Sequence, residues 1–495
     1  MTKNGYILSI DQGTTSSRAA LVSQDGNIIC QKNIEFKQYF PESGWVEHNP
    51  QEIITSTVNC IEYVIEKSGI GQNDIITAGI TNQRETILAW NKKTGDPVYN
   101  AIVWQDRRTE YICQSLRDKN YQDLIQFKTG LIIDPYFSAS KIQWILEHVD
   151  EAKSLSSNND LLIGTIDTWL IWNLTNKQSH VTDATNASRT MIYNINNDQW
   201  DEELLEIFSI PKNILPEVKN SMDEFGSINK DLFGYEIPIH GVAGDQQAAS
   251  FGQLCFEKGM VKSTYGTGCF MLMNTGQEVK KSQNKLLSTT AFKSKDKKMF
   301  ALEGSIFNAG TVVQWMRDEL SFYNEAKDVE DLASQSKNIL TFVPAFTGLG
   351  APYWRSDIRG SIHGITRDTS KSDIALAALK SICFQSKDLF ICLQKDMNNT
   401  ASNYIMRVDG GMSQNNLMMQ YLTDLLQVPV ERPVIQETTV MGAAFLAGLQ
   451  YGLYKSIDEL KNLWKTDHLF EPRSKKEQLD EEYNHWLQII EKETM

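Results

Sequence analysis

The sequence lacks several patterns that mark large classes of protein. Neither of its two candidate phosphate-binding turns, described below, contains the Gly-x-x-x-x-Gly-Lys loop or the Gly-x-Gly-x-x-Gly motif of common nucleotide-binding folds. The 7 cysteines are scattered without a Cys-x-x-Cys pair, and the 7 histidines show no metal-ligand spacing. The longest apolar runs, such as residues 440–449, fall short of the roughly 18 residues of a membrane-spanning helix. These absences argue against a disulfide scaffold, a zinc protein and a membrane protein.

An excess of positive charge is also missing. The formal net charge is −14 and the isoelectric point is near 5.1. We therefore expect no nucleic-acid partner and no membrane insertion, and an anionic ligand would have to be held by local donors or a metal ion. The N-terminal residues show no charged-then-apolar leader, which together with the scattered cysteines favours a cytoplasmic protein.

The chain does have the length for two large domains. Its 495 residues, 41% of them apolar, exceed what one core usually holds. Three short strands over residues 5–36, a helix over 53–65 and a buried strand over 75–81 predict an α/β architecture. The segment 161–189 is predicted to be strand-like. We place the domain boundary so that residues 1–252 form an N-terminal domain and residues 253–495 a C-terminal domain.

The stretch Ile7–Arg18 carries the first functional signal. An apolar strand leads to Asp11, Gly13 turns the backbone, and a group of hydroxyl and cationic side chains follows, formed by Thr14, Thr15, Ser16 and Arg18. Such a turn can direct N–H groups and hydroxyls at phosphate oxygens, with a carboxylate beside them for a divalent metal. Taken alone, a polar hairpin that binds nothing is the commoner outcome.

A second glycine turn in the other half of the chain changes that balance. Val261–Met273 contains a strand, the sequence Gly266-Thr267-Gly268 and another strand, which repeats the logic of the first hairpin. The economical interpretation is one phosphate-binding hairpin per domain, the two facing each other across a cleft.

Other polar groups follow predicted strands. Arg84 and Glu85 end the strand over 75–81, at the edge where open α/β sheets place ligands, although a solvated ion pair is equally consistent. Asp245 and Gln246 follow a strand and Gly244 at a helix start, where an aspartate often serves only as a cap. Trp104 and Tyr136 bring aromatic rings to similar positions.

Taken together and in order, these motifs resemble the FGGY family of carbohydrate kinases over nearly the whole chain. The resemblance rests on residues 11–18, 44–48, 79–86, 136–148, 185–191, 244–249, 264–268, 344–354 and 407–411. It implies two actin-like ATPase domains of the ribonuclease H-like type flanking a deep interdomain cleft. It also implies ATP-dependent phosphorylation of glycerol to sn-glycerol 3-phosphate, with Mg²⁺ as the metal and a homodimer or homotetramer as the assembly.

The resemblance further assigns residues. Glycerol would be bound by Arg84, Glu85, Trp104, Tyr136, Asp245, Gln246 and Phe270. ATP or ADP would be bound by Thr14, Thr15, Ser16, Arg18, Thr267, Gly310, Gln314, Gly411 and Asn415. In the reaction we assign Asp245 as the base for the attacking hydroxyl and Asp11 as the carboxylate that holds magnesium.

The sequence departs from the family pattern in two places, and two alternative functions remain. Residues 227–234 contain neither a Gly-Gly loop for fructose 1,6-bisphosphate nor a phosphorylatable histidine, so neither control is expected, and Lys380 stands where a family signature usually has an acidic residue. The nearest alternative is a family kinase for xylulose, ribulose or gluconate, and a more distant one is an actin- or chaperone-like ATPase acting on protein partners. Arg84 and Glu85 favour glycerol because donor-only and acceptor-only groups can orient two hydroxyls.

Overall fold

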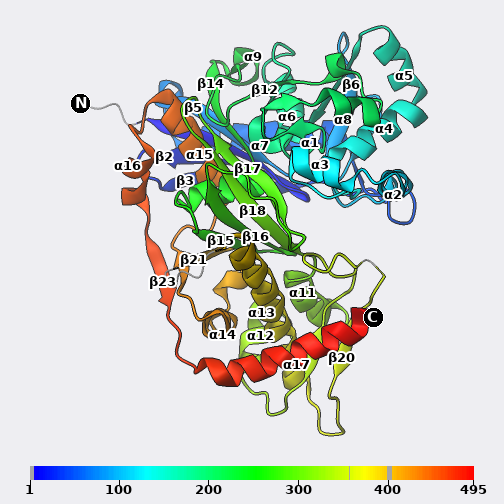
Figure 1. Ribbon diagram of the computed structural model, residues 1–495. Helices are drawn as coiled ribbons and strands as arrows, with labels where there is room; N and C mark the ends of the chain where they lie inside the picture. The colour runs from blue at the N-terminus through cyan, green and yellow to red at the C-terminus, as the bar shows by residue number, and fades with distance from the viewer. Residues whose placement is uncertain (1–4, 356, 399–403, 495) are drawn as a thin grey trace.

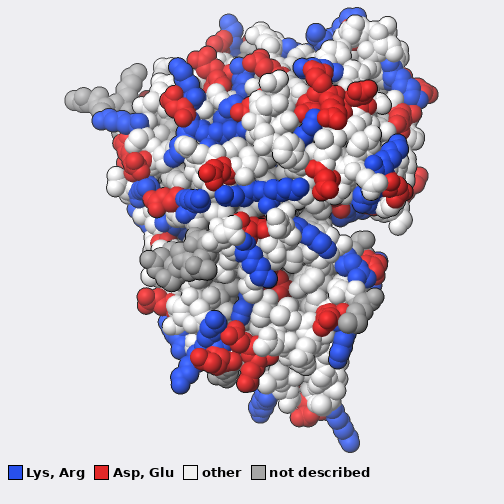
Figure 2. All heavy atoms as spheres, viewed as in Figure 1, with Lys and Arg blue, Asp and Glu red and all other residues white. Residues whose placement is uncertain are grey.

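Two large β-sheets form the frame of the molecule (Figure 1). The computed structural model describes residues 5–355, 357–398 and 404–494, so residues 1–4, on which the expectation of no leader partly rests, lie outside it. Helices cover the sheets on both sides, which confirms the α/β class. The space-filling view shows acidic and basic side chains intermingled on one face and a notch between the upper and lower parts of the molecule (Figure 2).

The first sheet is built mainly from the N-terminal half. Its strands lie in the order β13 (Ser227–Ile228), β14 (Ile237–Gly244), β5 (Ile75–Asn82), β1 (Tyr6–Gln12), β2 (Ser16–Ser23) and β3 (Ile28–Glu35). β1, β2 and β3 are antiparallel neighbours, whereas β5 runs parallel to β1 and β14 runs parallel to β5. Ile7, Leu8 and Ile10 of β1 are all fully buried because both faces of the sheet are covered.

The second sheet repeats this pattern. Its strands lie in the order β17 (Leu287–Lys293), β18 (Lys298–Ile306), β16 (Cys269–Gly276), β15 (Val261–Tyr265), β21 (Met406–Asp409), β22 (Val430–Pro433) and β23 (Thr466–Phe470). β18, β16 and β15 are antiparallel neighbours, and β21 and β22 continue the sheet in parallel. The β15–β16 hairpin therefore occupies the position in this sheet that the β1–β2 hairpin occupies in the first.

A helix from late in the chain closes the first sheet. α15 (Thr438–Tyr451) packs against α10 (Asp245–Gly252) and strands β1, β5 and β14 (Figure 1). A Cβ added at Gly79 of β5 would overlap the Ala443 carbonyl of α15, and one added at Gly442 would overlap the Ala248 carbonyl of α10. Glycine is therefore required for this close approach. The small residues of α15 thus serve tight packing, and the domain boundary at residue 253 stays a prediction.

Two further helices frame the sheets. α1 (Pro50–Ser68) begins at Asn49, whose side chain accepts from the N–H groups of Gln51 and Glu52, and it covers β2 and β3. α13 (Lys371–Asp396) crosses the second sheet and carries α17 (Lys476–Thr494) on its outer side. Lys380, the departure noted above, donates to Glu482 of α17 at 2.6 Å.

The remaining elements surround this frame. A four-stranded sheet contains β4 (Glu47–His48), β7 (Ala101–Ile102), β6 (Ile87–Asn91) and β8 (Leu161–Thr165). Short strands are β9 (Val181–Asp183), β10 (Tyr193–Asn194), β11 (Gln199–Trp200), β12 (Glu217–Lys219), β19 (Thr341–Val343) and β20 (Ser361–His363). The other helices are α2 (Glu110–Asp118), α3 (Gln122–Thr129), α4 (Ser138–His148), α5 (Asp150–Ser157), α6 (Ile166–Leu174), α7 (Ala184–Ala187), α8 (Glu202–Ile207), α9 (Lys230–Phe233), α11 (Gly310–Asp318), α12 (Val329–Ala333), α14 (Asn416–Leu426) and α16 (Ile457–Leu460). The prediction of strand over 161–189 is confirmed for β8 and β9 and is wrong for residues 166–174 and 184–187, which form α6 and α7.

Candidate active site

The first predicted hairpin brings its carboxylate to the contact between the two halves of the chain. Asp11 is the penultimate residue of β1, and its Oδ2 accepts a hydrogen bond from Thr439 Oγ1 of α15 at 2.9 Å. Burial raises the pKa of Asp11, the charge of Arg18 opposes this rise, and the charge of Asp245 adds to it. Arg18 forms an ion pair with Glu437. Asp11 and Asp245 therefore lie close enough to influence each other electrostatically.

The strand end that carries Arg84 and Glu85 is strained. Glu85 has φ +61°, in the left-handed region that side chains other than glycine rarely adopt. Both side chains are almost fully buried, which excludes the alternative of a solvated pair. The Arg84 Nε and Glu85 Oε1 atoms are 3.9 Å apart, and Arg84 Nε is 3.1 Å from Asp245 Oδ1. Three residues predicted to bind one ligand thus meet at this point.

A fourth carboxylate, which the sequence analysis did not select, anchors these groups. Glu303 of β18 is fully buried and accepts from Arg84 Nη1 at 2.5 Å, from Arg84 Nη2 at 3.1 Å and from Arg189 Nη2 at 3.0 Å. Arg189 Nε also donates to Glu85 Oε1 at 2.5 Å. We call Arg84, Glu85, Arg189 and Glu303 the charged cluster. Within it, opposite charges alternate from one side chain to the next.

The electrostatics of the charged cluster follow from this alternation. Burial disfavours the ionised form of Glu303, but the charges of Arg189 and Arg84 outweigh burial and lower its pKa to about 2. Burial likewise acts against the charge of Arg84, and Glu303 and Glu85 reverse that effect and hold the Arg84 pKa well above its ordinary value. Burial raises the pKa of Glu85 against the charges of Arg189 and Arg84. Glu303 and Arg84 are therefore held in their charged forms inside the protein.

Asp245 and Gln246 occupy the first turn of α10, as predicted. The Asp245 side chain is 28% exposed, unlike the members of the charged cluster, and its Oδ1 accepts from the Gln246 N–H at 2.7 Å. The N-terminus of a helix favours a negative charge. A partly accessible carboxylate at this position can accept a proton from a bound molecule.

The three predicted aromatic residues lie together. The ring centroids of Trp104 and Tyr136 are 5.5 Å apart and those of Trp104 and Phe270 are 6.4 Å apart. The Trp104 indole Nε1 donates to Thr14 Oγ1 at 3.0 Å. Phe270 is the strand partner of Thr264, close to the turn of the second hairpin. Trp104 thus contacts Thr14 of the first hairpin and Phe270 of the second, so it brings the two hairpins to one region of the molecule.

Five of the predicted nucleotide-binding residues line one cavity. Thr267, Gly310, Gln314, Gly411 and Asn415 border a volume of about 360 Å³, together with Tyr265, Gly266, Val313, Ala326, Lys327, Val329, Glu330, Met412 and Gln414. A Cβ at Gly310 would lie 2.5 Å from the Gly266 carbonyl oxygen, so the turn requires glycine there. We call this cavity the glycine pocket. Thr14, Thr15, Ser16 and Arg18 do not line it, because they belong to the opposite hairpin.

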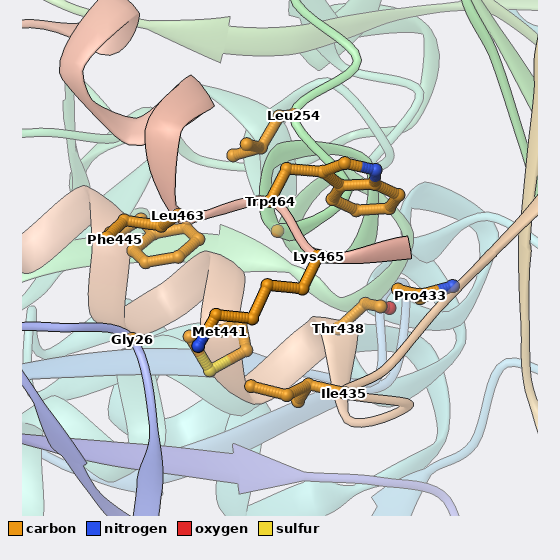
Figure 3. A pocket seen from close by; sticks show the side chains of 11 residues that line it. Gly26, Leu254, Pro433, Ile435, Thr438, Met441, Phe445, Leu463, Trp464 and Lys465 are labelled. Atoms are coloured by element: carbon orange, nitrogen blue, oxygen red, sulfur yellow. The ribbon is translucent and has the colours of Figure 1, made fainter. Parts of the chain in front are cut away.

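A second, smaller cavity lies elsewhere and contains none of the predicted residues. It holds about 40 Å³ and is bordered mainly by apolar side chains such as Leu254, Met441, Phe445 and Leu463 (Figure 3). In the part of the chain that the structure describes, no group of three or more His, Cys, Asp or Glu residues could hold a metal ion. No described helix is both long enough and apolar enough to span a lipid bilayer.

Comparisons with known proteins identify the family of this chain. Residues 6–252 match the N-terminal domain, and residues 261–451 the C-terminal domain, of the FGGY family of carbohydrate kinases. A glycerol kinase of Marinomonas sp. (strain MWYL1) is 52% identical over 489 residues, which is 98% of each chain, and one of Listeria monocytogenes serovar 1/2a is 50% identical over 488 residues, with the same coverage. The crystal structure of Plasmodium falciparum glycerol kinase with ADP superposes with a TM-score of 0.92 at 38% identity, covering 99% of both chains. The resemblance seen in the motifs is confirmed: this chain belongs to the FGGY family of carbohydrate kinases.

Proposed function

We propose that this protein transfers the terminal phosphoryl group of ATP to glycerol, giving sn-glycerol 3-phosphate and ADP. The observation that carries the proposal is the meeting of Arg84, Glu85 and Asp245 beside the Trp104–Tyr136–Phe270 aromatic group. The relatives at about half identity over nearly their full length are glycerol kinases, which supports this substrate over the pentuloses and gluconate.

Glycerol would be held by groups of fixed hydrogen-bonding character. Arg84 can only donate and Glu85 can only accept, so the two can orient neighbouring hydroxyls. Glu85 Oε2 accepts no hydrogen bond from any described residue, whereas the Arg84 guanidinium already contacts Glu303, Gln247 and Asp245, with Tyr136 Oη at 3.5 Å. We infer that a glycerol hydroxyl takes the place of this long Tyr136 contact.

The chemistry then needs alignment and one proton acceptor. Asp245 would accept the proton of the attacking hydroxyl, while Trp104, Tyr136 and Phe270 pack against the glycerol carbons and exclude water. Thr14, Thr15, Ser16 and Arg18 on one hairpin, and Thr267, Gly310, Gln314, Gly411 and Asn415 on the other side, would bind the nucleotide. Closely spaced backbone N–H groups in such turns suit phosphate oxygens.

Asp11 would provide the protein's contribution to magnesium binding. Mg²⁺ is often bound through one or two carboxylates, with water and phosphate oxygens filling the other positions. Asp11 fits because its Oδ1 accepts no hydrogen bond from a described residue, and because metal binding would favour the ionised form that burial opposes. When bound, the metal ion would neutralise charge on the phosphates.

ADP release in the presence of Mg²⁺-ATP tests the proposal. We expect release to depend on glycerol and to be far slower with xylulose, ribulose or gluconate. Asp245→Asn should lower kcat by roughly 10² to 10⁴, the usual effect of losing a general base, with glycerol binding retained. Asp318→Asn, a change at an exposed carboxylate, is the control and should behave as wild type. Equal ADP release with and without any polyol would overturn the assignment.

The proposal also includes the localisation and the oligomeric state of the protein. We infer a cytoplasmic protein, supported by the seven cysteines, all of which are unpaired. We also infer a homodimer or homotetramer, and sedimentation equilibrium would distinguish these states from a monomer.

A further inference from the structure

Lys262 is a buried lysine close to the predicted polyol-binding residues. It lies on β15, a central strand of the second sheet, and is fully buried. Its Nζ donates to Gln246 Oε1 at 2.5 Å, and Nζ makes no other hydrogen bond to a described residue. Among the described residues, no carboxylate oxygen lies within 4.0 Å of the Lys262 ammonium group. Other buried cations, such as Arg84 and Arg108, do have a carboxylate within that distance.

Burying an ammonium group against a neutral amide is unfavourable. A charge removed from water is usually compensated by a paired opposite charge, and Lys262 has no such direct partner. Burial lowers its pKa, and the more distant charges of Asp409 and Asp245 oppose that shift. A methionine would fill the same space without this cost. The position of the amine therefore calls for an explanation other than packing.

The bond from Lys262 settles the orientation of the Gln246 amide. An ammonium group has three donors and no acceptor, so it can bind only the carbonyl end of the amide. The Oε1 atom is thereby fixed toward Lys262, and Nε2 is left as the outward end. Nε2 donates to no described residue, so both of its N–H groups remain available to a ligand. A hydroxyl oxygen with free lone pairs is the complementary group.

We propose that Lys262 is a positioning residue for polyol binding, which holds Gln246 so that its amide donates to a hydroxyl oxygen of the substrate. The inference rests on the proposed function, since that function makes Gln246 a substrate contact. It adds a division of roles: Glu85 accepts from the polyol, and Gln246 is kept as a donor to it. The bond also joins α10, which follows the first sheet, to the strand that leads into Gly266, so the amide is oriented from the opposite half of the chain.

The test is a double-mutant cycle on glycerol binding. Lys262→Met keeps the volume and removes the donor, and we expect KM and Kd for glycerol to rise about tenfold, the scale of one lost hydrogen bond to a buried group. KM for ATP should stay within about twofold. Gln246→Ala should also weaken glycerol, and adding Lys262→Met to Gln246→Ala should change little further, because Lys262 acts through the amide. Lys387→Met, at a lysine of α13 that is paired with Asp480 of α17, is the matched control.

A second variant covers the case in which Lys262→Met does not fold. Gln246→Glu preserves an acceptor for Lys262 and replaces the donor Nε2 by an oxygen, so glycerol affinity should fall while the fold persists. Wild-type glycerol affinity in Gln246→Glu, or effects of Lys262→Met and Gln246→Ala that simply add, would overturn the proposal. Failure of the proposed function has a different signature, since wild-type protein would then not turn over glycerol at all.

Discussion

The charged cluster and the glycine pocket use different chemistry to prepare the two halves of one site. The charged cluster relies on long side chains from segments far apart in sequence, with Glu303 reaching both Arg84 and Arg189. The glycine pocket relies on backbone turns that approach closely, because a Cβ at Gly310 would lie 2.5 Å from the Gly266 carbonyl oxygen. One end of the site is thus held by charge and the other by shape.

This difference predicts different responses to substitution. In the charged cluster each charge is buried with its partner, so removing one member leaves the others uncompensated, and fold and function should fail together. In the glycine pocket a small added group changes the space for the nucleotide without exposing a buried charge. Substitutions at the two ends should therefore be separable by measuring stability beside substrate affinity.

The largest effect is expected for Glu303→Gln. The change leaves Arg84 and Arg189 with a neutral partner, and breaking such a buried ionic arrangement costs about 3–5 kcal/mol of unfolding free energy. Because Arg84 would also lose its orientation, kcat/KM for glycerol should fall by at least about 10³. Denaturant unfolding and ADP-release kinetics on the same preparation measure both quantities.

The control for Glu303→Gln is Glu482→Gln on α17. Glu482 accepts from Lys380 at 2.6 Å but is partly exposed, so its loss should cost about 1 kcal/mol or less and leave glycerol kinetics unchanged. If Glu303→Gln proved no more damaging than Glu482→Gln, the charged cluster would not be the support of the polyol end.

The sequence predicted the parts of the site whose signals are local. Both hairpins, the strand end at Arg84–Glu85 and the helix start at Asp245 were found because strand, turn and polar residue follow one another within a few positions. Gln314 and Asn415 were assigned through the family resemblance, and they line the same cavity as Gly310.

The rest depended on contacts between distant segments. Glu303 was passed over because it lies in the middle of a buried strand, and its partner Arg84 is 219 residues away. A carboxylate inside an otherwise apolar strand was the one available signal, since buried charges are normally paired. The helix α6 was missed for another reason: nearly every residue of Ile166–Leu174 is buried, so the segment has no polar face, and a short buried run does not distinguish a helix from a strand.

Gly310→Ala should damage the glycine pocket selectively. Its Cβ would lie 2.5 Å from the Gly266 carbonyl oxygen, so the two turns would have to separate, at a cost of about 1–3 kcal/mol. We expect KM for ATP to rise roughly tenfold or more, by the same energy scale, with glycerol affinity nearly unchanged.

Gly411→Ala sharpens this test, because a Cβ at Gly411 would meet nothing within 4 Å in the protein. Stability should be close to wild type, and any weakening of ATP would come from contact with the nucleotide itself. A loss of stability in Gly411→Ala equal to that in Gly310→Ala would contradict the view that shape alone holds this pocket.

Near the predicted polyol-binding residues, Lys141 should make the free energy of unfolding change with pH in the alkaline range. Its buried Nζ donates to the carbonyl oxygens of Pro135, Tyr136 and Phe137, which fixes the turn that carries Tyr136. Burial lowers the pKa of Lys141 from 10.5 to about 8. Between these values the unfolded chain binds more protons than the folded chain, so the stability contributed by this group rises with pH through that window.

The comparison of wild type with Lys141→Met isolates this contribution. From pH 8 to 9.5 the difference in unfolding free energy should move in favour of wild type by about 1–2 kcal/mol, at up to about 1.4 kcal/mol per pH unit. Lys387→Met, at a lysine of α13 outside the charged cluster, is the matched control for the substitution itself. A difference that stays constant over this range would mean that Lys141 keeps an ordinary pKa.

The smallest effect should come from the bond that connects the first hairpin to the aromatic group. Thr14→Val removes the acceptor of the Trp104 indole N–H while keeping the shape of the side chain, and one such bond contributes about 1 kcal/mol. Because Trp104 packs against Tyr136 and Phe270, its displacement should weaken glycerol, and loss of the Thr14 hydroxyl should weaken ATP, each by about three- to fivefold. Thr15→Val, which leaves the Trp104 bond intact, should affect ATP alone. If Thr14→Val also left the glycerol affinity unchanged, the two ends of the site would be energetically independent. The charged cluster and the glycine pocket would then be two neighbouring sites without coupling between them.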